Sequence, residues 1–308
     1  MYSQDEITYG LFGIDPAEYY ATKFLENVLD VKAEVSNKAV TGSIIYLKTD
    51  LLIDAVKKYQ PKKILDLGCG SGAFGARIKY HCPSVQVYGV DLSDQCAQVA
   101  KKNHYDDAIS YDVLRGLPYP DETFDLLFAM DFFGHIEFKN KDRIINEIHR
   151  VTKRGGYGFH GIETGFVDYY QCNPNDNEDP IRKYVHKEGH IGVEPLEAII
   201  GRFGKKFNII TAYPFPFSPF LNIDNVMISG FWGQEFDAAI KPWINYNAKV
   251  VFDVAMGYCN KYVLNMLIEI FGNVLTQEKL KGLNIPGLEK LVKGCGFSFT
   301  LVQKVELN

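Results

Sequence analysis

The chain has 308 residues, of which 46% are hydrophobic and 23% are charged, and its formal net charge is −5 at pH 7. These values are those of an ordinary globular protein, and they exclude a fibrous repeat or a largely disordered chain. The acidic balance argues against broad nucleic-acid binding, which depends on clustered Lys and Arg facing phosphates. We therefore expect a folded, soluble protein whose partner is a small molecule and not a nucleic acid.

The first twenty residues, MYSQDEITYGLFGIDPAEYY, lack a basic segment followed by an apolar run. No secretory signal is predicted, and a cytoplasmic location is expected. The most apolar later stretch, 250–271, contains Asp253, Lys261 and Glu269, which are costly at the centre of a membrane span. It is interpreted as a buried helix, without stable membrane insertion. The sequence leaves a homo-oligomer open.

Short apolar runs alternate with helical patterns through the first half of the chain. An apolar run at 62–67 stops at a glycine cluster, and a helix is predicted at about 73–81. Ser93 suits the start of another helix, and isoleucines at helical spacing predict a third at about 140–153. The further predicted strands are 85–91, 107–111, 124–130 and 156–163. Such alternation predicts a parallel sheet covered by helices on both faces.

Beyond residue 165 the alternation weakens, and the segment CNPNDNEDP at 172–180 is polar and rich in turn formers. A helix at 194–203 and a strand at 207–213 indicate a return to the sheet. The segment FSFTLVQKV near the end of the chain predicts a last strand. Between these two strands the sequence is rich in aromatic residues, which predicts a cap over the core.

The glycine-rich segment ILDLGCGSGAFG at 64–75 carries the clearest functional signal. Gly68, Gly70 and Gly72 permit a sharp turn and a close approach of the backbone to a ligand. The N-terminus of the next helix favours an anionic group, because its N–H groups lack intrahelical partners. A strand, an acidic residue and GxGxG in this order resemble the first motif of the class I, Rossmann-like methyltransferases that depend on S-adenosylmethionine.

The resemblance covers residues 60–165 and implies a role for each matching position. Asp66 would meet the ammonium of S-adenosylmethionine, directly or through water, and the turn Gly68, Cys69, Gly70 and Gly72 would hold its methionyl carboxylate. Asp91 would accept from both ribose hydroxyls, beside Leu92 on the adenine. Further along, the adenine amino group and ring would meet Asp112 and the backbone N–H of Val113. Met130, at the end of the fourth strand, is a further expected cofactor-binding residue.

Together the elements and the resemblance imply an α/β fold with a doubly wound, mainly parallel seven-stranded sheet, helices on both faces, an antiparallel last strand and helical cap insertions. The expected organisation is an N-terminal helical lid at 1–60, a cofactor-binding core at 61–165, a cap segment at 166–193, a return to the sheet at 194–213, a helical, aromatic-rich cap at 214–290 and the final core strand at 291–308. The expected activity is methyl transfer to a small-molecule acceptor, at oxygen or nitrogen in preference to carbon.

A hydroxyl or ammonium acceptor must lose a proton, and candidate bases follow the fourth and fifth predicted strands. The candidates are His135, His160 and Glu163. Strand alternation places His160 and Glu163 on opposite faces unless the strand ends between them. We therefore prefer His135 as the general base, and we interpret His160 as a structural side chain.

Two other interpretations of the motif stay open. Gly70, Gly72 and Gly75 also spell GxGxxG, with Asp91 about 20 residues further on, as in nicotinamide-binding proteins. A protein that binds S-adenosylmethionine without catalysis fits as well. His186 and His190 have a spacing that suits metal ligands on a helix, but Gly189 and Gly192 argue against a helix there. No metal site is therefore predicted.

Overall fold

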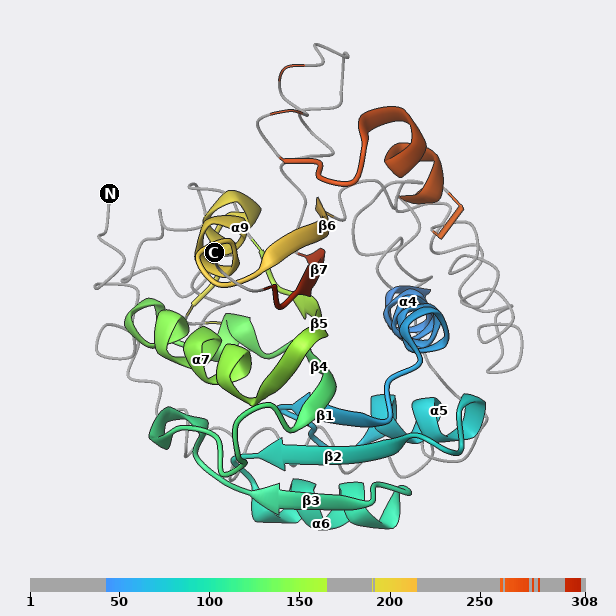
Figure 1. The fold of residues 1–308 in the computed structure, drawn as a ribbon, viewed down its shortest axis with the longest axis vertical. Helices are drawn as coiled ribbons and strands as arrows, with labels where there is room; N and C mark the ends of the chain where they lie inside the picture. Colours follow the sequence, from blue (N-terminus) through green and yellow to red (C-terminus); the bar gives the residue numbers. More distant parts are fainter. Residues whose placement is uncertain are drawn as a thin grey trace, which may run out of the picture.

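A computed structural model describes residues 43–164, 190, 192–214, 261–262, 264–276, 279, 282 and 297–305. Within them, seven strands form one sheet in the order β3-β2-β1-β4-β5-β7-β6 (Figure 1). In chain order the elements are α4 (Ser43–Tyr59), β1 (Lys63–Leu67), α5 (Ala73–His81), β2 (Gln86–Asp91), α6 (Asp94–Lys102), β3 (Asp107–Ser110), the short 3₁₀ helix η4 (Val113–Arg115), β4 (Phe124–Met130), a second 3₁₀ helix η5 (Phe133–His135), α7 (Phe138–Val151), β5 (Thr152–Ile162), α9 (Leu196–Phe203), β6 (Asn208–Pro214) and β7 (Ser298–Gln303).

Strand pairing is parallel from β3 to β5 and antiparallel around β7. β1 pairs in parallel with both β2 and β4, which in turn pair in parallel with β3 and β5. β7 runs antiparallel to β5 on one side and to β6 on the other. The predicted doubly wound seven-stranded sheet with an antiparallel last strand is therefore confirmed, and the predicted strands differ from the observed ones by only a few residues.

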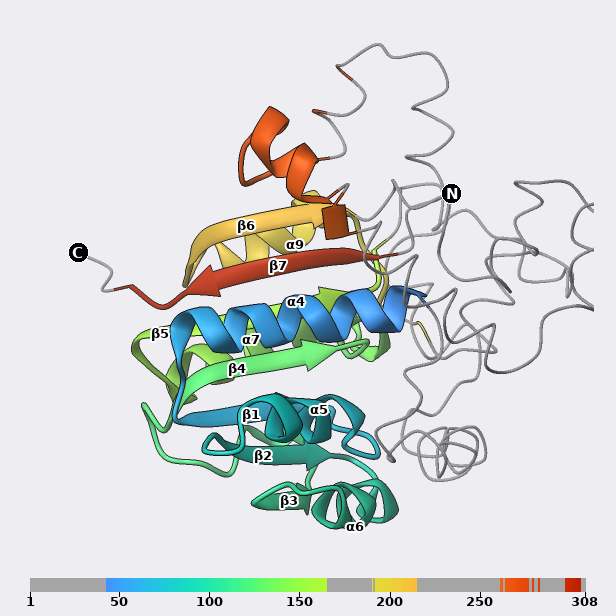
Figure 2. The same cartoon turned by 90° about the vertical axis from the view of Figure 1, so that its right-hand side faces the viewer.

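Helices cover both faces of this sheet, which explains why its central strands are apolar without alternation. α4, α5 and α6 lie on one face, and α7 and α9 lie on the other (Figure 2). On β4, Leu126 and Phe128 pack in the core on the α4 side, whereas Leu127 and Ala129 pack in the core on the α7 side. Both sets are buried, because successive strand residues point to opposite faces and each face has its own helical layer.

The expected lid and caps are described only in part. Residues 1–42, 165–189 and 215–260 lie outside the described residues, so the predicted lid at 1–60 and caps at 166–193 and 214–290 stay predictions over those stretches. Residues 264–271 are helical, and nearby Lys261 pairs with Asp50 and Asp54 of α4 at 2.6 Å in each case. None of the described helices is long and apolar enough to cross a membrane.

A buried ion pair fixes the chain just before α9. Lys141 of α7 and Glu194 lie 2.9 Å apart, and each side chain is only 1% exposed. The Lys141 ammonium also donates to the carbonyl of Gly192, and the Arg202 guanidinium pairs with Glu194 at 3.0 Å. The segment 192–194 is therefore held against α7 at the carboxyl end of the sheet.

We expect Glu194→Gln to lower the free energy of unfolding by about 3–5 kcal/mol, because it leaves the Lys141 ammonium buried without its charged partner. Urea unfolding measures this change. Lys205→Ala is the matched control, since Lys205 pairs with Asp142 at 2.9 Å in the same network but is 62% exposed. The Lys205→Ala substitution should lower the free energy of unfolding by at most about 1 kcal/mol. Equal losses in the two variants would contradict a special role for the buried pair.

Candidate functional site

The strand order reverses between β1 and β4, and this reversal sets the position of the site. The chain leaves β1 toward α5 on one face of the sheet and leaves β4 toward α7 on the other (Figure 2). Ligands of open α/β sheets bind at such a point, outside the carboxyl ends of the strands. Nearly all of the predicted site residues fall at or just after the ends of β1 to β5.

The glycine turn after β1 has the conformation that its sequence predicts. Gly68, Gly70 and Gly72 have φ angles of 76°, 50° and 84°, in the left-handed region that disfavours side chains. A Cβ on Gly68 would lie 2.6 Å from the ring of Phe132. Gly72 precedes α5 and supplies no side-chain cap. The start of α5 therefore offers backbone N–H groups to an anionic group.

Asp91 connects the end of β2 to this turn. Its carboxylate accepts from the backbone N–H of Gly70 at 2.8 Å and from that of Ser93 at 2.9 Å. Burial raises the pKa of Asp91, while these backbone donors act to lower it. The neighbouring Leu92 is apolar yet 38% exposed. A carboxylate beside an exposed apolar side chain suits a ligand that has hydroxyl groups next to a flat ring.

Asp66 lies inside the core, with 1% of its surface exposed. Its carboxyl accepts from the Tyr105 hydroxyl at 2.5 Å, and that hydroxyl accepts from the backbone N–H of Gly75 at 3.0 Å. Burial raises the pKa of Asp66 to about 8, although the hydrogen bond from Tyr105 acts to lower it. The Asp66 carboxyl therefore ties β1 to the first turn of α5. Sequence reasoning missed Tyr105, which lies 39 residues away along the chain.

The remaining predicted cofactor residues border the same edge. Asp112 precedes η4 and accepts from the backbone N–H of Leu114 at 2.9 Å, and Val113 follows it, partly exposed. Met130 ends β4 and is buried. The thiol of Cys69 is buried as well, in the middle of the glycine turn. Their contacts with a cofactor stay predictions.

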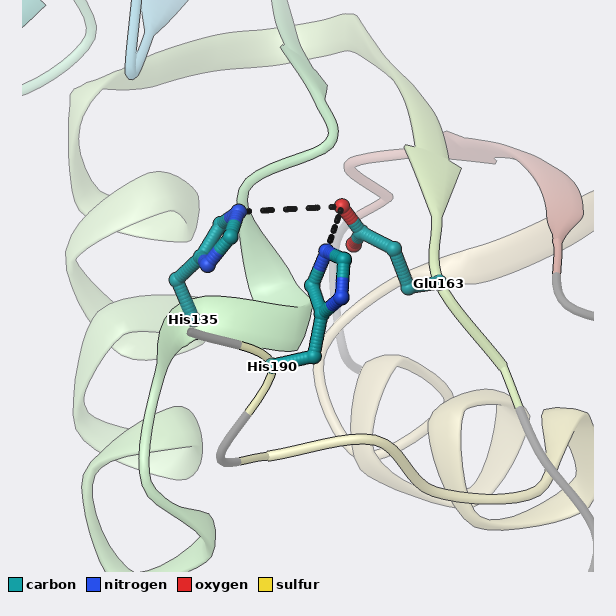
Figure 3. Close-up of side chains that lie close together, drawn as sticks. All are labelled: His135, Glu163 and His190. Atoms are coloured by element: carbon teal, nitrogen blue, oxygen red, sulfur yellow. Dashed lines mark ion pairs between the residues drawn. The ribbon is translucent and has the colours of Figure 1, made fainter. Parts of the chain in front are cut away.

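Two of the predicted catalytic residues come together, and a third side chain joins them (Figure 3). His135 ends η5, Glu163 follows β5, and His190 belongs to the segment before α9. Glu163 Oε1 lies 4.0 Å from His135 Nε2 and 3.6 Å from His190 Nε2. The two imidazole rings stack with centroids 4.6 Å apart. We call these three residues the His–Glu–His cluster.

Backbone contacts between three segments hold the His–Glu–His cluster in place. The N–H of Gly134 donates to Glu163 Oε2 at 3.0 Å, and the N–H of Gly192 donates to the carbonyl of Gly134 at 2.8 Å. Thr164 and Glu194 form an isolated parallel bridge. A Cβ on Gly134 would lie 2.8 Å from Glu163 Oε2. Glycine at position 134 therefore allows the carboxylate to approach the backbone of η5.

Glu163 is ionised at neutral pH although it is buried. Burial would raise the pKa of Glu163, but the two facing imidazoles and a backbone N–H lower it to about 2. The carboxylate is therefore a fixed negative charge next to His135, and it can orient that imidazole or stabilise its protonated form.

His160 lies apart from the His–Glu–His cluster. It is fully buried, stacked on Phe203 with ring centroids 4.8 Å apart and edge-on to Phe133. Burial lowers the pKa of His160 to about 3, and neither ring nitrogen has a hydrogen-bond partner in the described part of the chain. Within the described part of the chain, His160 is thus enclosed by aromatic rings, whereas Glu163, beyond the end of β5 at Ile162, faces His135 and His190.

A second charged pair borders this edge, and sequence reasoning assigned it no role. Lys48 of α4 and Asp131 lie 2.5 Å apart. Asp131 directly follows β4 and has a φ angle of 53°, which is uncommon for a residue with a side chain. Its backbone N–H donates to the carbonyl of Gly161 at 3.0 Å, at the end of β5. Backbone strain of this kind concentrates at functional sites.

The fold and the carboxyl edge of its sheet define a doubly wound α/β protein, with a glycine-rich turn after β1 of the kind that binds nucleotide cofactors. Residues 65–159 match the family described as "Methyltransferase domain". Residues 65–159, within a sheet that has the class I, Rossmann-like strand order, are thus a methyltransferase-type domain, and the methyl donor of that class is S-adenosylmethionine.

Similar proteins extend this finding. The demethylmenaquinone methyltransferase of Thermotoga maritima is 29% identical over 105 residues, which are 34% of this chain and 45% of the relative. A phosphoethanolamine N-methyltransferase 2 from Haemonchus contortus, solved with phosphomonomethylethanolamine and S-adenosylhomocysteine, has a TM-score of 0.58 at 16% identity, covering 95% of this chain and 61% of that one. The [4+2]-cyclase SpnF has a TM-score of 0.54 at 16% identity, covering 94% of this chain and 97% of that one.

These comparisons are uneven along the chain. The matched part spans less than half of the Thermotoga maritima relative. The residues that match the family end at 159, before Glu163 and His190. The alignments with the solved structures cover nearly the whole chain at low identity. One of them is a [4+2]-cyclase, so the fold alone does not establish methyl transfer.

We expect Asp66→Asn to remove part of the pH dependence of stability. The pKa of Asp66 is raised in the fold, so the folded state keeps a proton that the unfolded chain releases. Stability should then fall as the pH rises from about 4 to 8, by at most about 1.4 kcal/mol per pH unit. Urea unfolding at pH 5 and pH 8 should give a steeper loss for the natural protein than for the variant. Parallel profiles would contradict a protonated Asp66.

Proposed function

We propose that this chain transfers a methyl group from S-adenosylmethionine to a small-molecule acceptor, at oxygen or nitrogen in preference to carbon. The observation that carries the proposal is the glycine turn at the point where the strand order reverses between β1 and β4. The carboxylate of Asp91 accepts a hydrogen bond from Gly70 in the middle of this turn. The small-molecule names of the similar methyltransferases support the acceptor class.

The residues at this edge fit the cofactor chemically. The left-handed glycines and the uncapped start of α5 suit its carboxylate. Asp91 suits the ribose hydroxyls and Leu92 the adenine, while Asp112 and Val113, which follow β3 at the same edge, would meet the ring. Asp66 is buried against Tyr105, so it would meet the ammonium through water, and that positive charge favours its ionised carboxylate. When bound, S-adenosylmethionine supplies an electrophilic methyl group on a sulfonium.

Position accounts for most of the catalysis in this proposal. Attack on the methyl group is in line, so the acceptor must be held at near-attack distance, and orientation of this kind supplies at best about 7–11 kcal/mol. His135 takes the acceptor proton as general base. Glu163 acts as a positioning residue, because it holds a negative charge beside the His135 imidazole. Segments outside the described residues, including the proposed caps, would exclude water.

We expect Asp91→Asn to weaken binding of S-adenosylhomocysteine by about 10–100-fold, because an amide cannot serve both backbone donors and ribose hydroxyls. Calorimetric titration of the full chain measures this. Asp106→Asn is the matched control: Asp106 also accepts a backbone N–H, that of Val87 at 2.8 Å, but at the opposite end of the sheet. The Asp106→Asn variant should bind S-adenosylhomocysteine as the natural protein does. Binding of NADH in place of S-adenosylhomocysteine would overturn the proposal.

We expect His135→Gln to lower kcat by about 10²–10⁴-fold while binding of S-adenosylhomocysteine stays unchanged, because a general base acts only on the acceptor. A panel of small hydroxyl and amine compounds with methyl-labelled donor identifies an acceptor for this assay. His81→Gln, an exposed histidine at the end of α5, is the control and should keep full activity. Full binding without transfer to any compound would favour a non-catalytic cofactor-binding protein.

A further inference from the structure

The His–Glu–His cluster has a composition that a proton-transfer site does not require. A single base needs one imidazole and one orienting carboxylate, yet here a second imidazole stacks on the first and faces the same oxygen (Figure 3). We propose that His135, Glu163 and His190 together bind one divalent transition-metal ion, of which Zn²⁺ is the leading candidate. This differs from the expectation from sequence, which predicted no metal site.

The donor set suits such an ion. Two imidazole nitrogens and one carboxylate oxygen are the three protein ligands of a recurrent class of catalytic zinc sites, which keep a fourth position for water or substrate. Imidazole also favours Zn²⁺ and its transition-metal neighbours over Mg²⁺ and Ca²⁺, which prefer oxygen ligands. The donors come from three separate segments, so they converge only in the folded chain.

The distances are close to those of a ligated site. One ligand atom from each of the three residues lies within 4.8 Å of the other two. Ligands bound at about 2.1 Å around a tetrahedral ion lie about 3.4 Å apart. Glu163 Oε1 is 3.6 Å from His190 Nε2 and 4.0 Å from His135 Nε2, slightly more than that. Small side-chain rotations toward the ion would close the difference.

The surroundings orient the donors as a metal site requires. Ligating carboxylates are themselves hydrogen-bonded, and here the N–H of Gly134 holds Glu163 Oε2 and turns Oε1 toward the imidazoles. The bond from Gly192 to Gly134 and the buried Lys141–Glu194 pair hold the segment that follows His190. The side chains of His135 and His190 are 11% and 14% exposed, so an ion has access from the carboxyl edge.

The consequence for catalysis rests on the proposed function. An ion held by the His–Glu–His cluster would polarise an acceptor oxygen and lower the pKa of an acceptor hydroxyl. His135 would then act as a ligand and not as the general base, and its loss would abolish metal binding together with activity. Binding of the ion itself requires no cofactor and no acceptor, so it can be measured separately.

The experiment is a titration of chelator-treated full-length protein with Co²⁺, followed by its visible absorption, with Zn²⁺ then added as a competitor. We expect one equivalent of Co²⁺ to bind, with the intense bands of a four-coordinate site, and Zn²⁺ to displace it. Glu163→Gln and His190→Ala should each weaken binding at least tenfold. His81→Ala is the control and should bind as the natural protein does.

The natural protein alone also tests the site, which matters if a variant folds poorly. Its Co²⁺ form should show two hyperfine-shifted imidazole N–H resonances in NMR, one from each ligand histidine. Absence of stoichiometric Co²⁺ binding to the natural protein, or binding unchanged in both cluster variants, would overturn the proposal. Titration with S-adenosylhomocysteine in the presence of chelator tests the cofactor site independently, so either proposal can fail alone.

Discussion

The two loops that leave β1 and β4 must turn to opposite faces of the sheet, and the site depends on this constraint. Crossovers between parallel strands are right-handed, so a sheet that grows outward from β1 in both directions sends its connections to opposite sides. A crevice opens where the connections diverge. The glycine turn lies on one side of this crevice and η5 on the other, so a cofactor group and a reactive cluster meet at one edge.

Chemistry is confined to that edge because the rest of the sheet is covered. Both faces of the central strands are buried under helices, and polar groups there need partners that the core seldom supplies. His160 illustrates the limit: two residues before the end of β5, it packs against two aromatic rings, and burial keeps it neutral. Glu163, three residues further on, keeps its charge because imidazoles face it. Distance from the strand end decides whether a side chain belongs to the core or to the site.

The sequence predicted those features of the fold that depend on a few neighbouring residues. The strand and helix bounds, the left-handed glycines and the N-cap at Ser93 follow from patterns a few residues long, and the order of strand ends placed Asp91 and His135 at one edge. His190 could not be placed in this way, because it reaches Glu163 only through backbone contacts of Gly192 and Glu194. Lys48 was missed for the same reason, since it lies 83 residues from Asp131. Gly192 was interpreted as a helix breaker, and its role in close backbone packing needs the fold.

The antiparallel pairing of β6 and β7 has a consequence for how such proteins diversify. Pro214 ends β6 and faces Ser298 at the start of β7, so the chain leaves and re-enters the sheet at adjacent points. A connection whose ends are already adjacent can change length at little cost, since the entropic cost of closing a loop grows only logarithmically with its length. Evolution can therefore exchange residues 215–260 for a segment of another size or chemistry while the cofactor side of the sheet is untouched. New acceptor preferences could arise by such replacement, without any redesign of the cofactor-binding half.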